Sequence, residues 1–301
     1  MIELLNYIPE WELIVFSAVF GSLWGSFANV VIVRWPKELS VVSPPSHCFS
    51  CGTTIKWYDN IPIISYIILQ GKCRVCKTKF SPRYAFVELA MGIISASIMF
   101  LALKSNNEIT LNVLAVFAIW FIFTLGLLII AMIDLEHYLI PNEIVLPGII
   151  LGILANMFIF PLGYIEPIVS AVVGYAGIRL LFIDGYRLLR GQAGMGLGDA
   201  KLMAMLGAFL GYEGALFSLF AAAFQGLIIG IIMVLFRRKE GLENEPVFEE
   251  DSEPQDSSSA ITRARVPFGP FLALAALEYL FIGDWVLTVY TNFIARLLYG
   301  L

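Results

Sequence analysis

The chain has 301 residues, of which 59% are hydrophobic and 14% charged, and its mean hydropathy is +0.82. Soluble domains contain about 45–50% apolar and about 25% charged residues, so the composition excludes an ordinary soluble enzyme and predicts a polytopic membrane protein. The formal charge of −5 carries little information, because membrane proteins distribute charge by side and not by total. We therefore expect a lipid bilayer, and no nucleic acid, among its partners.

Eight apolar runs predict membrane-spanning helices, although the sixth is short for a span. A further apolar stretch at 285–301 either extends the last helix or lies in the membrane interface. Acidic residues precede the first run and no small-residue cleavage site follows it, so we interpret it as a retained helix and not a signal peptide. The fold class is all-α and polytopic. The runs cover residues 12–33, 84–103, 112–133, 143–160, 166–183, 200–212, 214–236 and 268–283.

The lysines and arginines predict the orientation. Residues 34–83 hold eight basic and two acidic side chains, which predicts that this segment lies on the cytoplasmic side of the membrane. Counting helices from there puts the turn at Asp134 and the loop before Asp199 on the same side. The loops left for the far side, around 105–110, 161–166 and 212–213, contain no Lys or Arg.

Composition divides the chain into three regions. Residues 1–33 form the first membrane helix, 34–83 a polar cytoplasmic insert, and 84–301 a helical membrane body. Within the body, the acidic low-complexity segment 239–261 has few apolar residues and is predicted to be disordered. A solvated linker explains it more simply than a regulatory segment does.

All four cysteines lie in the insert, in two C-x2-C pairs separated by 21 residues. Two such pairs can place four thiolates at the corners of a tetrahedron around Zn²⁺. Two disulfides or four free thiols would also fit the pattern, but a reducing cytoplasmic face disfavours disulfides. Four sulfurs would close the metal shell, so the zinc is expected to be structural, unless the neighbouring His47 replaces a thiolate. The expected ligands are Cys48, Cys51, Cys73 and Cys76.

Two aspartates, Asp134 and Asp199, lie where long apolar segments meet short polar turns. An ionised carboxylate beside hydrocarbon is costly and therefore indicates function. Two carboxylates that share one proton can activate water and polarise a carbonyl, which is the chemistry of an aspartic protease. Gly196 and Gly198 allow a close backbone approach, and Asp199 would begin the next helix as its N-cap.

Simpler readings of these residues remain open. Asp134 could be a juxtamembrane residue reaching water, and Asp199 a plain helix cap. Lys201 could orient Asp199 or anchor the helix at the membrane face. The alternative acids are Asp184, Glu136 and Glu143, of which the first has arginines nearby and could be salt-bridged. A zinc hydrolase or a histidine-based catalytic triad has little support, because the sequence contains only two histidines, His47 and His137, and no H-E-x-x-H motif.

The motifs together resemble the bacterial type IV prepilin peptidases, a group of GxGD membrane aspartyl proteases. The resemblance covers nearly the whole chain. The matching segments are GSFANVVI (25–32), WYDNIP (57–62), RY (83–84), VEL (87–89), ID (133–134), PN (141–142), GMGLGDAK (194–201) and PFGPFLA (267–273).

The resemblance implies cleavage of a short basic leader before the hydrophobic N-terminal helix of prepilins or pseudopilins, with Asp134 and Asp199 as the catalytic pair. It also implies S-adenosylmethionine-dependent N-methylation of the new N-terminus, with Gly25, Asn29 and Glu88 as cofactor-binding candidates. A peptidase without methyltransferase activity, a cation transporter or metal sensor, and a structural assembly protein remain as alternatives.

Overall fold

The computed structural model describes residues 8–105, 110–160, 162–191, 194–240 and 267–299. Within these ranges the chain is helical, and its only β-pairing is two isolated bridges. Residues 241–261 of the predicted acidic loop lie outside the described residues.

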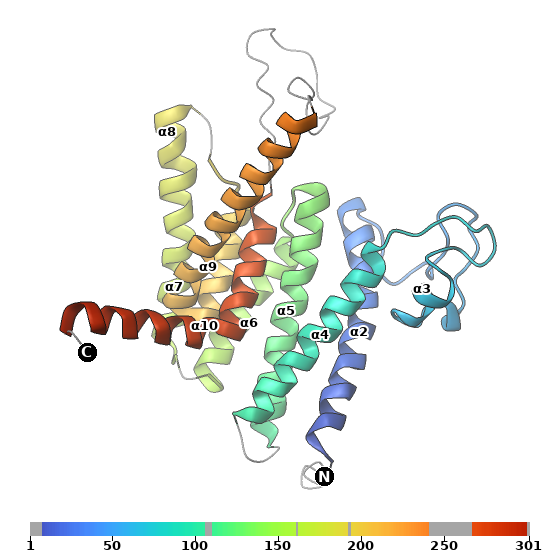
Figure 1. Cartoon of the computed structure of the whole chain (residues 1–301), viewed down its shortest axis with the longest axis horizontal. Coiled ribbons are helices and arrows are strands. Elements are labelled where there is room, and N and C mark those ends of the chain that lie inside the picture. Colours follow the sequence, from blue (N-terminus) through green and yellow to red (C-terminus); the bar gives the residue numbers. More distant parts are fainter. Residues whose placement is uncertain (1–7, 106–109, 161, 192–193, 241–266, 300–301) are drawn as a thin grey trace.

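Seven main helices carry all eight predicted apolar runs (Figure 1). Apolar segments in lipid become helices because every backbone N–H and C=O must find its partner within the segment. Five described stretches are long and apolar enough to span a membrane, and α6 and residues 269–283 are shorter apolar helices. The main helices are α2 (Glu10–Arg34), α4 (Arg83–Lys104), α5 (Leu111–His137), α6 (Asn142–Phe158), α7 (Ile165–Gly177), α9 (Leu197–Glu240) and α10 (Gly269–Tyr299).

Helix α9 holds two of the predicted runs, which a kink at Gly211 separates. Gly211 has φ 68° and ψ −171°, a conformation that glycine adopts at low cost. The kink interrupts the helical hydrogen bonds, and Asn156 of α6 donates its side-chain Nδ2 to the carbonyls of Ala208 (2.9 Å) and Phe209 (3.3 Å). A buried side-chain amide of a neighbouring helix therefore donates hydrogen bonds to the backbone carbonyls next to the kink.

Helix α7 continues without a break beyond its predicted end. It passes through the π-helical segment η3 (Ile178–Gly185) into α8 (Tyr186–Arg190), so this span covers 26 residues. The stretch after residue 285 likewise continues α10, which confirms one of the two expectations for it. Figure 1 shows that this last part of α10 turns away from the bundle toward the C-terminus.

Small residues let α2 and α4 cross closely. A Cβ added to Gly21 would lie 2.5 Å from the Met91 carbonyl oxygen, and one added to Gly25 would lie 2.8 Å from the Cα of Glu88. Gly21 and Gly25 are four residues apart, the spacing of the small-residue motif that packs membrane helices. The pair fixes the N-terminal helix against the start of the body.

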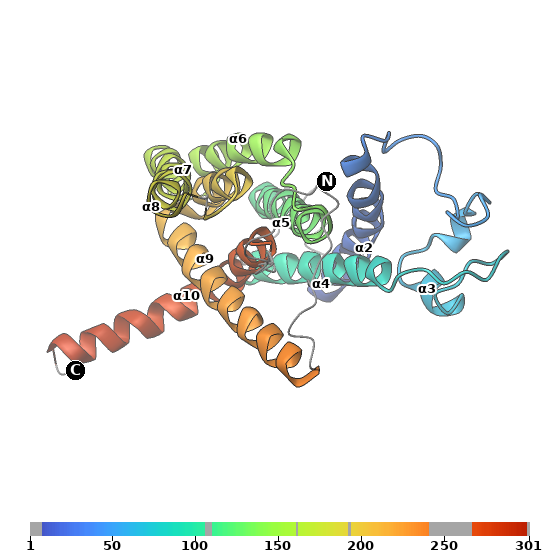
Figure 2. The same ribbon diagram turned by 90° about the horizontal axis from the view of Figure 1, so that it is seen from above.

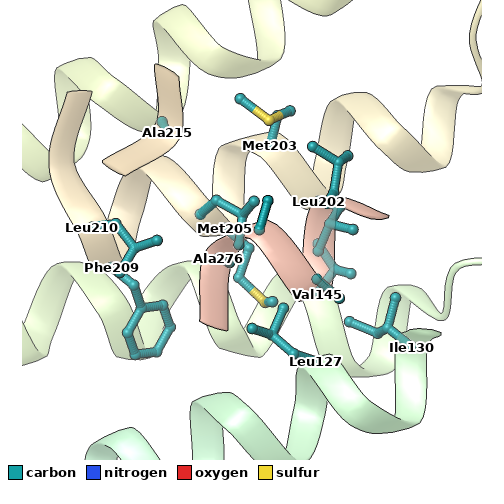
Figure 3. Close-up of a cluster of buried hydrophobic side chains, with 14 of the residues drawn as sticks. Leu127, Ile130, Val145, Leu202, Met203, Met205, Phe209, Leu210, Ala215 and Ala276 are labelled. Atoms are coloured by element: carbon teal, nitrogen blue, oxygen red, sulfur yellow. The ribbon is translucent and has the colours of Figure 1, made fainter. Parts of the chain in front are cut away.

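The main core lies where α5, α6, α9 and α10 meet (Figure 3). Leu127 and Ile130 of α5 face Val145 of α6 and Leu202 of α9 in this cluster. Phe123 of α5 also stacks on Phe209 of α9 with ring centroids 4.2 Å apart. Close packing of this kind supplies the dispersion energy that holds helices together in lipid, where the hydrophobic effect between them is absent.

The insert projects from one end of the bundle and contains only short elements: η1 (Trp35–Lys37), η2 (Trp57–Asp59) and α3 (Ile64–Ile68). Figure 1 shows the insert, the C-terminal end of α5 and the start of α10 at the same end of the bundle, opposite the N-terminus. Figure 2 shows the insert beside α2 and α4, away from α7 and α9. The fold thus gathers the sequence motifs at one end.

Candidate functional site

Asp134 lies in the last turn of α5 and is 6% exposed. The backbone N–H of Gly269, the first residue of α10, donates a hydrogen bond of 3.0 Å to its Oδ2. The first N–H groups of a helix lack partners within the helix and carry partial positive charge, so they favour an anionic acceptor. The N-terminus of α10 therefore positions this carboxylate.

Asp199 is 8% exposed, and its Oδ2 accepts a hydrogen bond of 3.1 Å from the backbone N–H of Gly196. The expectation that Asp199 is the N-cap is wrong, because α9 begins two residues earlier, at Leu197. Asp199 instead occupies the third helical position and reaches back to the residue before the helix, as the acid of a capping box does. Each aspartate is thus held by a backbone N–H at the start of a helix.

Ile140 lies between the two aspartate segments. A Cβ on Gly198 would be 3.0 Å from Ile140 Cβ, and one on Gly269 would be 3.3 Å from Ile140 Cδ1. The two glycines, one beside each aspartate, therefore pack on the same side chain. Ile140 therefore joins the segment of Asp199 to the start of α10 that holds Asp134.

The other residues singled out around the aspartates have separate partners. Lys201 Nζ donates to Asn142 Oδ1 at 2.8 Å, which ties α9 to the start of α6 and not to Asp199. Asp184 forms an ion pair with Arg179 at 3.5 Å, as its arginine-rich surroundings suggested. Glu136 pairs with Arg83, and Glu143 is exposed. Asp134 and Asp199 are the only acidic side chains that are buried in the part of the chain covered by the structure.

The four cysteines converge into one cluster. Their Sγ atoms all lie within 4.8 Å of one another, with Cys48 and Cys76 at 3.7 Å and Cys51 and Cys73 at 4.0 Å. Four sulfurs at about 2.3 Å from a central Zn²⁺ would be about 3.8 Å apart, so the spacing fits a tetrahedral site. His47 directs Nδ1 to the carbonyl of Pro45 (3.1 Å), and the cluster is complete without it.

The two C-x2-C pairs have the same local structure. The N–H of Cys48 donates to Thr53 O and that of Cys73 to Thr78 O, both at 2.9 Å. The side-chain and backbone hydrogen bonds of Thr78 lower the pKa of Cys76 to about 6. A thiol with this pKa is ionised at neutral pH, the form that binds metal.

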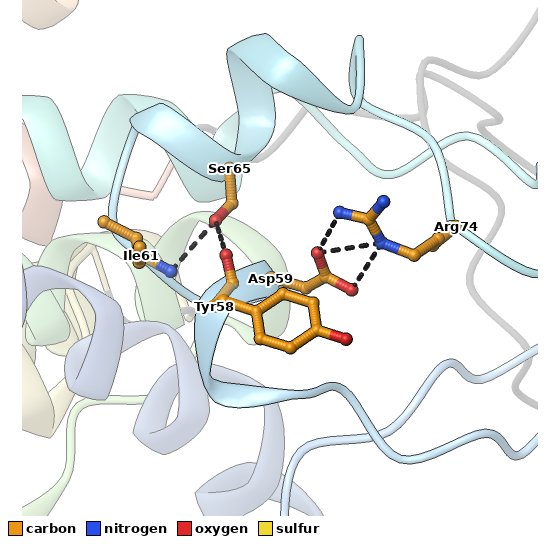
Figure 4. Close-up of polar contacts among 5 residues, drawn as sticks. All are labelled: Tyr58, Asp59, Ile61, Ser65 and Arg74. Carbon is orange, nitrogen blue, oxygen red and sulfur yellow. Dashed lines mark hydrogen bonds and ion pairs between the residues drawn. The ribbon is translucent and has the colours of Figure 1, made fainter.

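A residue of the second cysteine pair's loop, Arg74, binds Asp59 (Figure 4), which lines a neighbouring cavity. Arg74, between Cys73 and Cys76, donates from Nε to Asp59 Oδ2 at 2.8 Å and from Nη2 to Asp59 Oδ1 at 2.5 Å. These bonds hold the pKa of the Asp59 carboxyl below its usual value. Next to Asp59, Ser65 Oγ donates to the Tyr58 carbonyl and accepts from the N–H of Ile61.

We call this cavity the donor cavity, because two residues expected to bind the methyl donor S-adenosylmethionine line it. It encloses about 980 Å³ including its open mouth and lies between the insert and the ends of α2 and α4. Asn29 and Glu88 line it. Asn29 Nδ2 donates to the Tyr84 carbonyl (3.0 Å), whereas its Oδ1 is buried and has no hydrogen-bond partner among the described residues. Glu88 Oε2 accepts from the N–H of Ile63 at 2.8 Å.

Gly25 does not line the donor cavity, although it was expected to bind the cofactor with Asn29 and Glu88. Its contact is with the backbone of α4 at Glu88, so it positions that helix. Sequence reasoning also missed a role for Gly269 and Ile140. The PFGP segment that contains Gly269 was noticed, but only the folded chain shows that its N–H meets Asp134.

Two family models match the chain: the bacterial peptidase A24 N-terminal domain at residues 19–102, and the type IV leader peptidase family at residues 121–231. A protein of Myxococcus xanthus (strain DK1622) is 32% identical, with 95% of each chain covered. One of Pseudomonas aeruginosa is 31% identical over 96% of this chain and 98% of its own. One of Neisseria gonorrhoeae is 34% identical over 72% and 81%. All three are named prepilin leader peptidase/N-methyltransferase. No solved structure matches the chain.

Proposed function

Because the chain belongs to the type IV leader peptidase family, we propose that it cleaves the leader from prepilins or pseudopilins and N-methylates the new N-terminus. The observation that carries the peptidase is the burial of Asp134 and Asp199, whose neighbouring glycines Gly269 and Gly198 pack on the same side chain, Ile140. The observation that supports the methyltransferase is the donor cavity beside the insert.

In the cleavage reaction, one aspartate is ionised and the other protonated. The ionised carboxylate takes a proton from the attacking water, and the protonated carboxyl donates to the scissile carbonyl oxygen. The N–H groups of Gly269 and Gly196 hold one oxygen of each carboxylate and so fix the direction of the pair. Pre-set orientation of this kind lowers the entropic part of the barrier.

The polar and apolar side chains that line the donor cavity fit S-adenosylmethionine. When bound, this cofactor supplies an electrophilic methyl group. Asn29 Oδ1 has no hydrogen-bond partner in the described chain, so it can accept a hydrogen bond from an amino or hydroxyl group of the cofactor. The Glu88 carboxylate can bind the new ammonium group of the substrate and take its proton. Apolar side chains such as Ile61 and Leu69 complete the walls.

The cysteine cluster would bind one structural Zn²⁺ through Cys48, Cys51, Cys73 and Cys76. The insert is too small for a large core, so metal binding supplies much of its folding energy. Its place beside the donor cavity suggests that the metal stabilises the methyltransferase part and takes no part in cleavage.

The proposed substrate has a basic leader followed by an apolar N-terminal helix that already lies in the bilayer. Its helix can pack laterally against the bundle, with the scissile bond at the membrane surface near Asp134 and Asp199. The excess of basic residues in the insert supports a position for this surface on the cytoplasmic side of the inner membrane.

Mass spectrometry of a prepilin-like substrate incubated with membranes that carry the protein tests this function. The wild-type protein removes the leader and, with S-adenosylmethionine present, adds one methyl group. Asp134→Asn and Asp199→Asn each reduce cleavage by about 10²- to 10⁴-fold, because each removes one member of the acid–base pair. The matched control Asp184→Asn, in an exposed ion pair, leaves cleavage unchanged. Cleavage at the wild-type rate by both aspartate variants would rule out the mechanism. Cleavage by the wild-type protein without methylation would restrict the function to a peptidase.

A further inference from the structure

The helix that begins as α7 changes its hydrogen-bonding pattern next to the loop before Asp199. Its segment η3 is π-helical over Ile178–Gly185. In an α-helix the N–H of Tyr186 would bind the carbonyl of Phe182, four residues earlier, but here it binds the carbonyl of Ile183. The Phe182 carbonyl therefore lacks its α-helical partner and can accept a hydrogen bond from another segment. π-Helical segments are rare and often occur at functional sites.

A glycine of the loop before Asp199 supplies this hydrogen bond. The N–H of Gly194 donates to the Phe182 carbonyl at 3.0 Å. A Cβ on Gly194 would lie 2.8 Å from that carbonyl oxygen and 3.1 Å from Cγ of Tyr186, so a residue without a side chain lets the loop lie this close to η3 and α8. The side chain of Phe182 is exposed, so the contact uses its backbone together with the ring of Tyr186.

The loop is held at three successive residues. Gly194 binds η3, and Met195 packs against the main core. The next residue, Gly196, donates its N–H to the Asp199 carboxylate at 3.1 Å. The segment η3 is itself fixed in that core by Ile183, which is 3% exposed. A short stretch of chain, hydrogen-bonded at both ends, therefore connects η3 to the Asp199 carboxylate.

We infer that the Phe182 carbonyl and the Tyr186 ring are positioning groups for Asp199 in leader cleavage. They act through the loop: they fix Gly194, and thereby the Gly196 N–H that orients the carboxylate. An α-helix in place of η3 would occupy the Phe182 carbonyl and leave the loop without this bond. The inference rests on the proposed cleavage function and adds to it the support that η3 gives to one of the two aspartates.

The test changes the contact from each side in the full-length protein in detergent and measures kcat and KM for cleavage. Gly194→Ala adds the Cβ that meets η3, Tyr186→Ala removes the ring, and Tyr186→Phe retains it. Gly177→Ala, at the residue before η3, is the matched control, because a Cβ there has nothing within 4 Å. Methylation of a peptide that already lacks the leader, and the thermal unfolding midpoint, report the folded state independently of cleavage.

We expect Gly194→Ala and Tyr186→Ala each to lower kcat for cleavage by about tenfold or more, because a shift of about 1 Å in a reacting group can cost about 10²-fold in rate. KM should stay within about twofold of wild type, since the contact orients an acid–base group and does not bind the substrate. Tyr186→Phe and Gly177→Ala should cleave at about the wild-type rate, and all four variants should keep methylation and the unfolding midpoint.

Equal kcat values for Gly194→Ala and Gly177→Ala would overturn the inference. A parallel fall of cleavage and methylation, or a lower unfolding midpoint that accounts for the lost rate, would also overturn it, since the contact would then serve folding alone. A loss in Tyr186→Phe as large as that in Tyr186→Ala would remove the ring from the argument. Absence of cleavage by the wild-type protein would instead refute the proposed function, and this inference with it.

Discussion

The backbone N–H of Gly269 donates a 3.0 Å hydrogen bond to Oδ2 of Asp134, a residue 135 positions earlier in the chain. A Cβ at position 269 would lie 2.5 Å from the same oxygen. Any side chain at position 269 would therefore collide with the carboxylate. Glycine is required there for the N–H of this residue to reach Asp134.

Gly269→Ala should reduce leader cleavage strongly while the protein still folds. The added methyl group must displace the Asp134 carboxylate, and a shift of about 1 Å in a reacting group can cost about 10²-fold in rate. Gly226→Ala is the matched control, because a Cβ there meets only Phe271 at 3.8 Å, an ordinary contact. Steady-state cleavage assays check the difference. Equal rates in the two variants would show that the Gly269 contact does not position the aspartate.

Loss of the metal site should affect methylation and spare cleavage. Arg74 connects the Cys73–Cys76 pair to Asp59 in the wall of the donor cavity, whereas Asp134 and Asp199 contact no part of the insert through the hydrogen bonds described above. Cys73→Ser should release zinc, measured by atomic absorption, and lower methylation by about tenfold or more through loss of the insert's folding energy.

Arg74→Gln should also lower methylation and spare cleavage, with zinc still bound, because it removes the link to Asp59 and leaves all four cysteines in place. Lys79→Met, an exposed change in the same segment, is its control. A parallel fall of cleavage and methylation in Arg74→Gln would mean that the insert supports the whole enzyme and not the donor cavity alone.

Gly21→Ala should destabilise the protein through the contact between α2 and α4. The new Cβ would lie 2.5 Å from both the Met91 carbonyl oxygen and Ser95 Cβ, so the helices must separate, at a cost of about 1–3 kcal/mol. Gly230→Ala has open space around its Cβ and serves as control. Thermal unfolding in detergent should show a lower midpoint for Gly21→Ala only; an unchanged midpoint would show that the crossing can relax freely.

Asn156→Leu should destabilise the kink in α9. It removes the donor to the carbonyls of Ala208 and Phe209 and leaves them buried without that partner, which costs about 1–3 kcal/mol. Because the kink is remote from the donor cavity, the variant should lower cleavage and methylation in the same proportion as the folded fraction. A selective loss of one activity would contradict a purely structural role.

The sequence by itself determined the membrane class, the eight apolar runs, the pairing of C-x2-C motifs and the two acidic residues at the ends of apolar segments. These features follow from local physics: lipid requires helices about 20 residues long, and an unpaired carboxylate beside hydrocarbon is costly. The family resemblance, which the comparisons confirm, rested on the same short motifs.

Only the tertiary structure decided which residues meet. It placed Gly269 on Asp134, gave Asp199 the third position of α9, directed Lys201 to Asn142, and assigned Gly25 to helix packing. It also placed Asn29 of α2 and Glu88 of α4 in the wall of one cavity with the insert. These relationships join segments far apart in the chain and depend on how the helices cross. Side-chain volume and the closeness of backbone approach determine the crossing, and no local sequence pattern specifies it.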